Sequence, residues 1–260
     1  MKCLNIGCGC RYNSSWVNID INPVDKDVIG YDINKRIPFT DNSFDVVYHS
    51  HLIEHIPKKR AESFIKDCVR IVRPRGIIRV VVPDLEQIAR MYLKSLEQAV
   101  SGCEGWAANY EWMMLEMYDQ AVRNQPGGDM AAFLAKEHIP NKDFIIARIG
   151  VEARNFMETG SNTRPRDGRF LKKIYRVLRF GRDYMPVKIG RFRLSGEVHQ
   201  WMYDRYSLSV LLEKCGMTDI IQRSATESYL QDWVKWNLDT ETDGTIYKPD
   251  SLYMEGKKPA

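Results

Sequence analysis

Two apolar runs on either side of one helical pattern constrain the fold of this chain more than any other feature. Phe44–Tyr48 and Gly76–Pro83 have the apolar, β-branched content of strands that are buried in a parallel sheet. Between them, apolar residues recur at helical spacing, and Pro74 and Gly76 end the pattern. A strand, a helix and a strand at this spacing form a βαβ unit. We therefore predict an α/β fold with a Rossmann-like, doubly wound, mostly parallel sheet.

Shorter strand candidates lie on both sides of this unit. Lys2–Ile6 and Trp16–Ile21 precede it, Asp27–Tyr31 is a weaker candidate, and MTDIIQRSA and SLYMEGKK lie near the end of the chain. A helix over YSLSVLLEKC is expected to end at Gly216.

A long helical stretch interrupts the strand pattern. From Asp84 onward, three segments follow helical spacing, and strand signals of similar strength return only near the end of the sequence. We predict a helical insertion over 84–194 in a core made of 1–83 and 195–260.

The bulk composition is that of a globular protein. The chain has 260 residues, 44% of them apolar, and no apolar run near the roughly 20 residues that cross a bilayer. Its six cysteines are scattered, and its first residues lack the basic and apolar regions of a signal peptide. We expect a reduced, cytoplasmic protein, and a peripheral position at a membrane stays open.

The positive charge of the chain is concentrated in one segment. The net charge is +4, but 164–193 carries +9, which leaves −5 for the remainder. Within it, RFLKKIYRVLRFGR has apolar residues on roughly one side of a helix and basic residues among them. Such a segment suits an anionic membrane surface or a phosphate-bearing acceptor, and nucleic acid less well. It suits equally a surface helix that packs its apolar side on the core.

The first strand candidate runs into a glycine turn, and the second ends in an acid. LNIGCGC places Gly7 and Gly9 after the strand, where the backbone turns tightly and its N–H groups stay open to a ligand. Asp20 closes WVNID, where an acid accepts hydrogen bonds from ribose hydroxyls. A dinucleotide fingerprint needs a third glycine where this chain has Tyr12, which disfavours an NAD-dependent enzyme. By itself the turn fits a cofactor site and a bare bend about equally.

Longer segments resemble the class I S-adenosylmethionine-dependent methyltransferases, in the subgroup called type 11. The resemblance rests on LNIGCGC, WVNIDINP, DINKRIPFTDNSFDVVYHSHLIEHI, VRIVRPRGIIRVVVPD and HQWMYDRYSLSVLLEKCGMTDI. The chain departs from the family at Asn5, where an acid is frequent, and at Arg11, where a third glycine is frequent. Few residues separate the turn from the second strand, so the first helix must be short or missing.

The resemblance implies S-adenosylmethionine as cofactor and S-adenosylhomocysteine as product. It places Asp20 on the ribose, Ile21 on the adenine and the glycine turn against the methionine part. The cofactor residues that it implies are Asn5, Gly7, Cys8, Gly9, Asp20, Ile21, Asp32, Ile33, His49 and Ser50. An alternative for Asp32 fits almost as well, namely that it is an ordinary acid of a turn without a role in cofactor binding.

HSHLIEHI carries candidate catalytic residues. His51, Glu54 and His55 share one helical face, and with His199 they are our candidates, because a histidine can take a proton from an acceptor hydroxyl near neutral pH. We reject an inverted zinc-protease motif, because Pro57 limits the helix and no distal Glu motif is evident. Relatives with E-x-x-E-H hold a divalent ion here. Because His51 replaces the first Glu, we predict no metal site, although a divalent metal stays open.

The resemblance implies a methyltransferase whose insertion covers the active site and selects the acceptor. Relatives with this N-terminus and the HQWMYD-type return resemble enzymes of polysaccharide and glycoconjugate assembly. We therefore expect O-methylation of a sugar hydroxyl in a glycan, nucleotide-sugar or lipid-linked glycan. The alternatives are a small-molecule (natural-product) O/N-methyltransferase, an RNA 2′-O-methyltransferase, and a non-catalytic cofactor-binding subunit of a glycan-assembly complex.

Overall fold

The computed structural model of the chain describes residues 1–159 and 184–260, which divide into two compact units. The sheet unit contains Met1–Ile88, Arg148–Gly150 and Gln200–Ala260, and the helical unit contains Ala89–Ala147 and Val151–His199. The helical unit takes up most of the segment predicted as an insertion. Arg148–Gly150 nevertheless belongs to the sheet unit, because Gly150 packs so tightly on the Tyr247 carbonyl that a Cβ would lie 2.4 Å from its oxygen.

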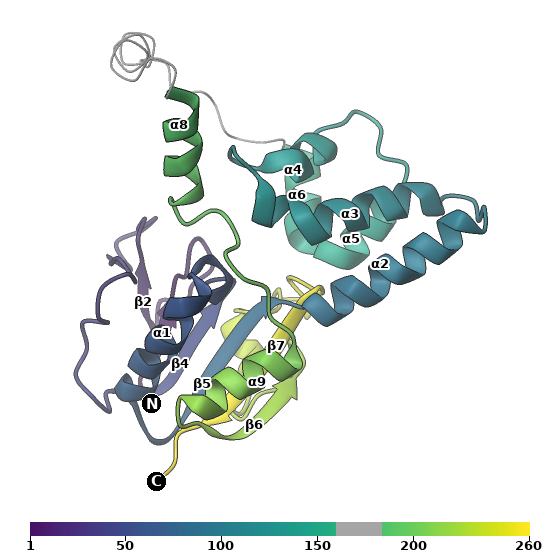
Figure 1. The fold of residues 1–260 in the computed structure, drawn as a ribbon. Helices are drawn as coiled ribbons and strands as arrows, with labels where there is room; N and C mark the ends of the chain where they lie inside the picture. Colours follow the sequence, from purple (N-terminus) through teal and green to yellow (C-terminus); the bar gives the residue numbers. More distant parts are fainter. Residues whose placement is uncertain (160–183) are drawn as a thin grey trace. The chain divides into compact units, whose positions relative to one another are not determined.

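The sheet unit is built on a seven-stranded sheet in the order β3-β2-β1-β4-β5-β7-β6 (Figure 1). The strands are β1 (Cys3–Ile6), β2 (Val17–Asp20), β3 (Val28–Gly30), β4 (Phe44–Ser50), β5 (Val72–Pro83), β6 (Thr218–Arg223) and β7 (Ser251–Lys257). The five strands β3, β2, β1, β4 and β5 are parallel to one another. β7 lies between β5 and β6 and is antiparallel to both. The predicted Rossmann-like, mostly parallel sheet is confirmed.

The predicted helices are present, and the boundary between α1 and the strand that follows it lies earlier than predicted. In the sheet unit they are η1 (Ile53–His55), α1 (Lys58–Ile71), α9 (Arg205–Lys214) and η3 (Trp233–Trp236). α2 (Leu85–Val100) leads into the helical unit, which also holds α3 (Trp106–Val122), α4 (Gly128–Leu134), α6 (Val151–Thr159) and α8 (Tyr184–Arg193); α5 (Lys142–Ile149) ends at the sheet unit. We predicted a strand from Gly76, but β5 begins at Val72. A residue before a proline avoids helical geometry. Arg73 precedes Pro74, so the helix ends at Ile71 and the backbone is extended at Val72.

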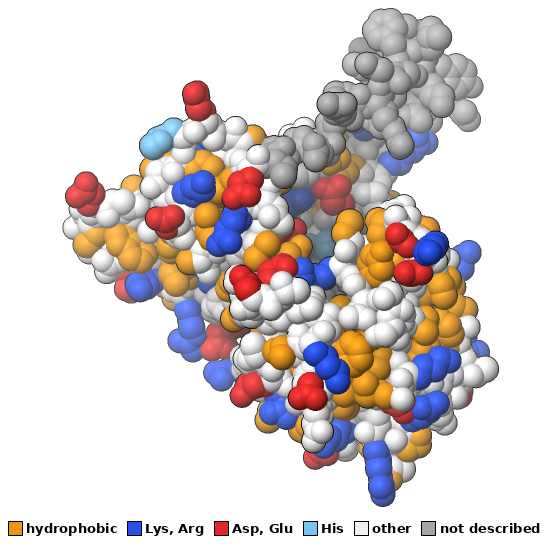
Figure 2. Space-filling model, turned by 180° about the vertical axis from the view of Figure 1, so that it is seen from behind, with side chains coloured by type: hydrophobic (Ala, Val, Ile, Leu, Met, Phe, Trp, Pro, Cys, Tyr) orange, Lys and Arg blue, Asp and Glu red, His pale blue; other side chains and the backbone are white. Residues whose placement is uncertain are grey.

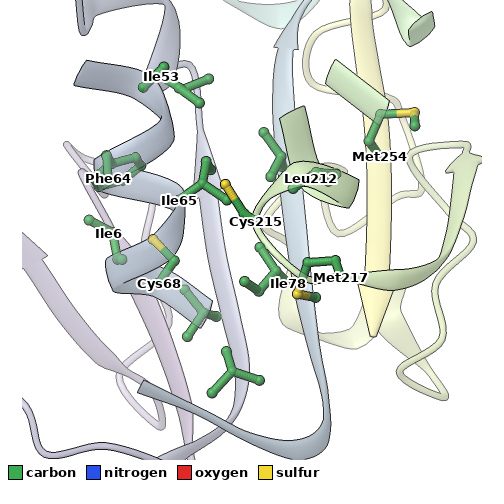
Figure 3. Close-up of a cluster of buried hydrophobic side chains, with 14 of the residues drawn as sticks. Ile6, Ile53, Phe64, Ile65, Cys68, Ile78, Leu212, Cys215, Met217 and Met254 are labelled. Carbon is green, nitrogen blue, oxygen red and sulfur yellow. The ribbon is translucent and has the colours of Figure 1, made fainter. Parts of the chain in front are cut away.

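α1 and α9 cover one face of the sheet and pack against each other (Figures 1 and 3). Ile65 and Cys68 of α1 and Leu212 of α9 are fully buried there, against strand residues such as Ile78 and Met254. This cluster is the larger of the two hydrophobic cores of the sheet unit. It fixes the strands whose ends build the site described below.

The opposite face is covered by 224–247, a segment with little regular structure. Trp16 packs edge-on against Tyr48 of β4 and Trp233 of η3, with ring centroids 6.3 and 6.0 Å apart. Between β1 and β2 the chain makes turns and no helix, so the expectation of a short or missing first helix is confirmed.

A buried ionic cluster holds this segment on the sheet. Arg79 of β5 has no exposed surface, and its Nε donates to Asp239 Oδ2 at 2.9 Å. Its Nη1 donates to Glu255 Oε1 at 3.0 Å. Asp239 also accepts the Tyr48 hydroxyl at 2.6 Å and the Trp233 indole N–H at 2.9 Å. Buried charges are tolerated only when paired and hydrogen-bonded in this way, so the cluster ties 224–247 to β4, β5 and β7.

The helical unit uses part of the basic segment as a helix cap. Most of 164–193, including Lys172, Lys173 and Arg176, lies outside the described residues. Within α8, Arg193 donates to the carbonyl oxygens of Ala121 and Val122, both at 3.0 Å, at the end of α3. Figure 2 shows basic and acidic side chains interspersed on the visible face. Among the described residues, no helix combines the length and the apolar composition that crossing a bilayer requires.

Candidate active site

The predicted site residues gather where β1, β2 and β4 end. β1 and β4 are neighbours at the centre of the sheet, and the chain continues from them in opposite directions, to β2 and to β5. In open α/β sheets, ligands bind outside the carboxyl ends of the strands at such a switch point. Gly7 follows β1, Asp20 ends β2, and His51 follows β4.

The glycine turn needs both of its glycines, for different reasons. Gly7 has a φ of +67°, and a Cβ on it would lie 2.7 Å from a methyl carbon of Leu52. Gly9 has a φ of +51°, but a Cβ there would meet no atom within 4 Å. The turn is therefore packed at Gly7 and open at Gly9, where a ligand can approach the main chain. Cys8 between them is buried, and burial raises the pKa of its thiol to about 12.

Asp20 is bound to the glycine turn. Its Oδ2 accepts the Gly9 N–H at 2.9 Å, and its Oδ1 accepts the Asn22 N–H at 2.8 Å. A carboxylate has about four lone-pair positions, so two remain for other donors. The half-buried Asp20 can thus hold a diol while it fixes the turn beside it.

The residues predicted for the adenine side lie in and beside an open, structured loop. Asp32 Oδ1 accepts both the backbone and the side-chain N–H groups of Asn34 at 2.9 Å. Arg60 of α1 then holds Asn34 through its side chain at 2.6 Å and its carbonyl at 2.9 Å. Ile33 packs partly on the core, and Ile21 is 57% exposed, an unusual position for a large apolar side chain unless a ligand covers it.

A family model described as "Methyltransferase domain" matches residues 4–80, the segment that contains the glycine turn, Asp20, the Asp32 loop and the end of β4. The protein is an S-adenosylmethionine-dependent methyltransferase. Its turn and acid fit this cofactor, because Gly9 leaves the main chain open and Asp20 keeps two acceptor positions for the ribose hydroxyls. The glycine turn, Asp20 and the Asp32 loop thus lie where β1, β2 and β3 end, and their contacts with the cofactor stay predictions.

Solved structures with a similar arrangement are distant. One is a SAM-dependent methyltransferase from Archaeoglobus fulgidus, at 13% identity and a TM-score of 0.39, covering 99% of this chain and 86% of that chain. Another is a putative methyltransferase from Bacillus halodurans, at 12% identity and a TM-score of 0.38, covering 100% and 93%. We draw no conclusion about activity from these likenesses. No curated protein matches the chain.

His51 of the methyltransferase is held from two sides. Its φ of +49° lies in the left-handed region, which is uncommon for residues other than glycine. Its Nδ1 lies 3.4 Å from Glu54 Oε1, and its Nε2 lies 3.0 Å from Ser251 Oγ. Its N–H donates to the Val81 carbonyl at 2.9 Å. The ring therefore stands between an acid and a hydroxyl, and these partners decide which nitrogen carries the proton.

Glu54 is the most perturbed acid of this site. It is fully buried, and burial raises the pKa of its carboxyl to about 8. A backbone hydrogen bond and Lys248 lower this pKa by smaller amounts, and Asp250 raises it further. Its carbonyl accepts the N–H groups of Gln200 at 2.6 Å and Trp201 at 3.2 Å, which connects η1 to the returning chain. Burial, with the nearby Glu54 charge, also raises the pKa of the Tyr203 hydroxyl to about 12.

The other predicted residues lie in different surroundings. The His49 ring is fully buried and packs edge-on against Phe64 of α1 with centroids 5.3 Å apart, and burial lowers its pKa to about 3. Ser50 ends β4, and His55 Nε2 lies 4.0 Å from Glu54 Oε1. His199 belongs to the helical unit. The roles of these residues, like the predicted absence of a metal, stay predictions.

Sequence reasoning missed Ser251 and Tyr203. Ser251 begins β7, far along the chain from His51, and only the pairing of β7 with β5 brings the two together. Tyr203 lies within the HQWMYD string, but nothing in that string indicates that its hydroxyl is buried near Glu54. Arg11 was seen as a departure from the family, and its contacts were not anticipated.

Proposed function

We propose that the enzyme O-methylates a sugar hydroxyl of a glycan, nucleotide-sugar or lipid-linked glycan, with His51 as the general base. The main support is the pairing of His51 with the buried Glu54 at the carboxyl end of β4, beside the switch point. A histidine held by an acid on one ring nitrogen is suited to take a proton on the other.

The chemistry of transfer to oxygen requires little more than this base. S-adenosylmethionine supplies a methyl group on a positively charged sulfur, which is already a good leaving group. His51 takes the hydroxyl proton of the acceptor at Nε2 while a carbon–oxygen bond forms and the carbon–sulfur bond breaks. Glu54, as a carboxylate, stabilises the resulting imidazolium through Nδ1. The Ser251 hydroxyl lies 3.0 Å from Nε2, and the acceptor hydroxyl would take its place at this nitrogen.

An aromatic side chain beside this base supports a sugar acceptor. Trp201 is 40% exposed, and its backbone N–H donates to the backbone carbonyl of Glu54 at 3.2 Å. The Lys58 ammonium lies 3.8 Å from the centre of its ring. Aromatic rings pack on the apolar faces of sugars, and a cation beside one suits a phosphate of a nucleotide-sugar. The net charge of +9 in the segment 164–193 supports, as a separate observation from the sequence, a phosphate-bearing acceptor or an anionic membrane surface.

His51→Asn is expected to lower kcat by about 100-fold, the lower end of what a general base contributes, because the leaving group is already activated. Asn tolerates a positive φ, so the fold should persist. The assay would measure S-adenosylhomocysteine release with sugars, nucleotide-sugars, small phenols and RNA as acceptors. His138→Asn, at an exposed histidine of the helical unit, is the matched control.

Several outcomes would contradict parts of this proposal. Unchanged turnover by His51→Asn would place the base elsewhere, and turnover of RNA or phenols instead of sugars would overturn the acceptor. Cofactor binding without any turnover would favour the non-catalytic subunit.

For the sugar contact, Trp201→Ala should raise the KM for the sugar acceptor by about 10-fold, a loss of the size that aromatic contacts give. Tyr206→Ala, at a tyrosine that is 77% exposed on α9, should not.

The pH dependence should separate activity from stability. Glu54 is faced by His51, His55, Tyr203, Lys248 and Asp250. Because its pKa is about 8, kcat/KM should rise with pH through that value as the carboxylate forms. The same shift, from 4.5 when unfolded, means that the native state holds the proton more tightly, so stability should fall as pH rises from about 4.5 to 8. Both slopes should disappear in Glu54→Gln, and persistence of either would assign it to another group.

A further inference from the structure

Arg11 makes more contacts than its place in a turn requires. Its Nε donates to the Leu238 carbonyl at 2.8 Å, its Nη1 to Glu241 Oε1 at 2.9 Å, and its Nη2 to the Thr240 carbonyl. Its guanidinium carbon also lies 3.9 Å from the centre of the Tyr247 ring. The edges and one face of the guanidinium are therefore all directed at the segment 238–247, a set of contacts that a lysine cannot reproduce.

The backbone of Arg11 closes the cofactor turn. Its N–H donates to the Cys8 carbonyl at 2.9 Å, and its own carbonyl accepts the side-chain amide of Asn5 at 3.1 Å. Gly9, which these bonds enclose, donates to Asp20. A shift of Arg11 is therefore transmitted to Gly9 and to the acid that holds the ribose.

The segment that Arg11 binds is anchored independently. Asp239 belongs to the buried cluster with Arg79, and its carbonyl accepts the Tyr247 N–H at 3.0 Å. Glu241 N–H donates to the Thr245 carbonyl at 2.8 Å, which closes a small hairpin. In a doubly wound fold the helix after the glycine turn holds it in place. This chain has turns there, and the anchored segment 238–247 lies beside the turn instead.

We propose that Arg11 is a positioning residue for the cofactor, and that it couples cofactor binding to the order of the segment 238–247. The guanidinium takes over the support of the glycine turn that the missing helix would give. Coupling between two sites is reciprocal, so a ligand bound at the turn must also stabilise 238–247. The inference rests on the assignment of the cofactor and not on the identity of the acceptor.

The test combines calorimetric titration of S-adenosylhomocysteine with amide hydrogen exchange over 238–247. In the wild type, the ligand should slow exchange in this segment. Arg11→Ala should bind the ligand about 10-fold more weakly, within the usual range of coupling, and should lose that protection. Arg11→Lys should recover part of the affinity, because it keeps the charge without the planar fork.

The matched control is Arg73→Ala, which removes a surface arginine paired with Asp45 at 2.6 Å. It should match the wild type in both measurements. Wild-type affinity in Arg11→Ala, or a ligand that leaves exchange in 238–247 of the wild type unchanged, would overturn the coupling. Failure of the wild type to bind would instead contradict the cofactor assignment. If Arg11→Ala did not fold, Arg11→Lys would decide the question by the same two readouts.

Discussion

Asp20→Ala is expected to weaken S-adenosylhomocysteine binding by about 1,000-fold, because two hydrogen bonds to a charged group contribute about 1.5–3 kcal/mol each. Two acceptor positions of the Asp20 carboxylate are available for the ribose hydroxyls, and its other two hold Gly9 and Asn22. The substitution therefore removes ligand contacts and loosens the turn together. Calorimetric titration would measure the effect, with NAD as a ligand that should not bind.

The control for Asp20 is Asp25→Ala. Asp25 also accepts a backbone N–H two residues later, from Asp27 at 3.1 Å, but it is an exposed residue of the next loop. Its variant should bind the ligand like the wild type. Asp20→Asn should fall between wild type and Asp20→Ala, since an amide oxygen still accepts a hydrogen bond. Equal affinities of wild type and Asp20→Ala would show that this acid does not hold the ribose.

Asp239→Ala is expected to lower the free energy of unfolding of the sheet unit by about 3 kcal/mol, because it leaves the buried Arg79 with part of its charge uncompensated. The value is at the lower end for a broken buried pair because Glu255 still accepts from Arg79 at 3.0 Å. Urea unfolding followed by tryptophan fluorescence suits this measurement, since Trp233 donates to Asp239 at 2.9 Å.

Two further variants make the interpretation specific. The triple variant Asp239→Ala/Arg79→Met/Glu255→Gln should recover much of the loss, because it removes all three charges of the buried cluster and leaves none of them unpaired. Asp41→Ala removes an acid whose side chain is 64% exposed and paired with Arg70 at 2.8 Å, and it should leave the free energy of unfolding close to that of the wild type. A triple variant no more stable than Asp239→Ala would show that lost packing, and not the charge, causes the effect.

Most of the sheet could be predicted because its strands and α1 carry local patterns. β4 and the apolar spacing of α1 are visible without any knowledge of their partners. The segment 224–247 has no such pattern, since Trp233 and Asp239 are held by contacts with Trp16 and Arg79, distant in sequence. An arginine within GIIRVVVP gives no local sign that its charge is matched by residues far along the chain.

The site was predictable to the same extent. The glycine turn and Asp20 follow from strand ends and from a resemblance, and the sheet brings them together as expected. The contact of His51 with Ser251 depends on β7 lying beside β5, which no pattern near either residue indicates. The positive φ of His51 was equally hidden, because histidine is not a residue that marks such a turn.

The position of β7 has a consequence for how the protein is made. β7 is the last strand along the described chain, yet it lies inside the sheet, hydrogen-bonded to both β5 and β6. While the ribosome is still synthesising residues before 251, β5 has an unpaired edge and Glu255 cannot yet meet Arg79. An open strand edge is a template for aggregation, and late, non-local pairing slows folding. The nascent enzyme is thus most vulnerable just before its synthesis reaches β7, when chaperones would have their main role.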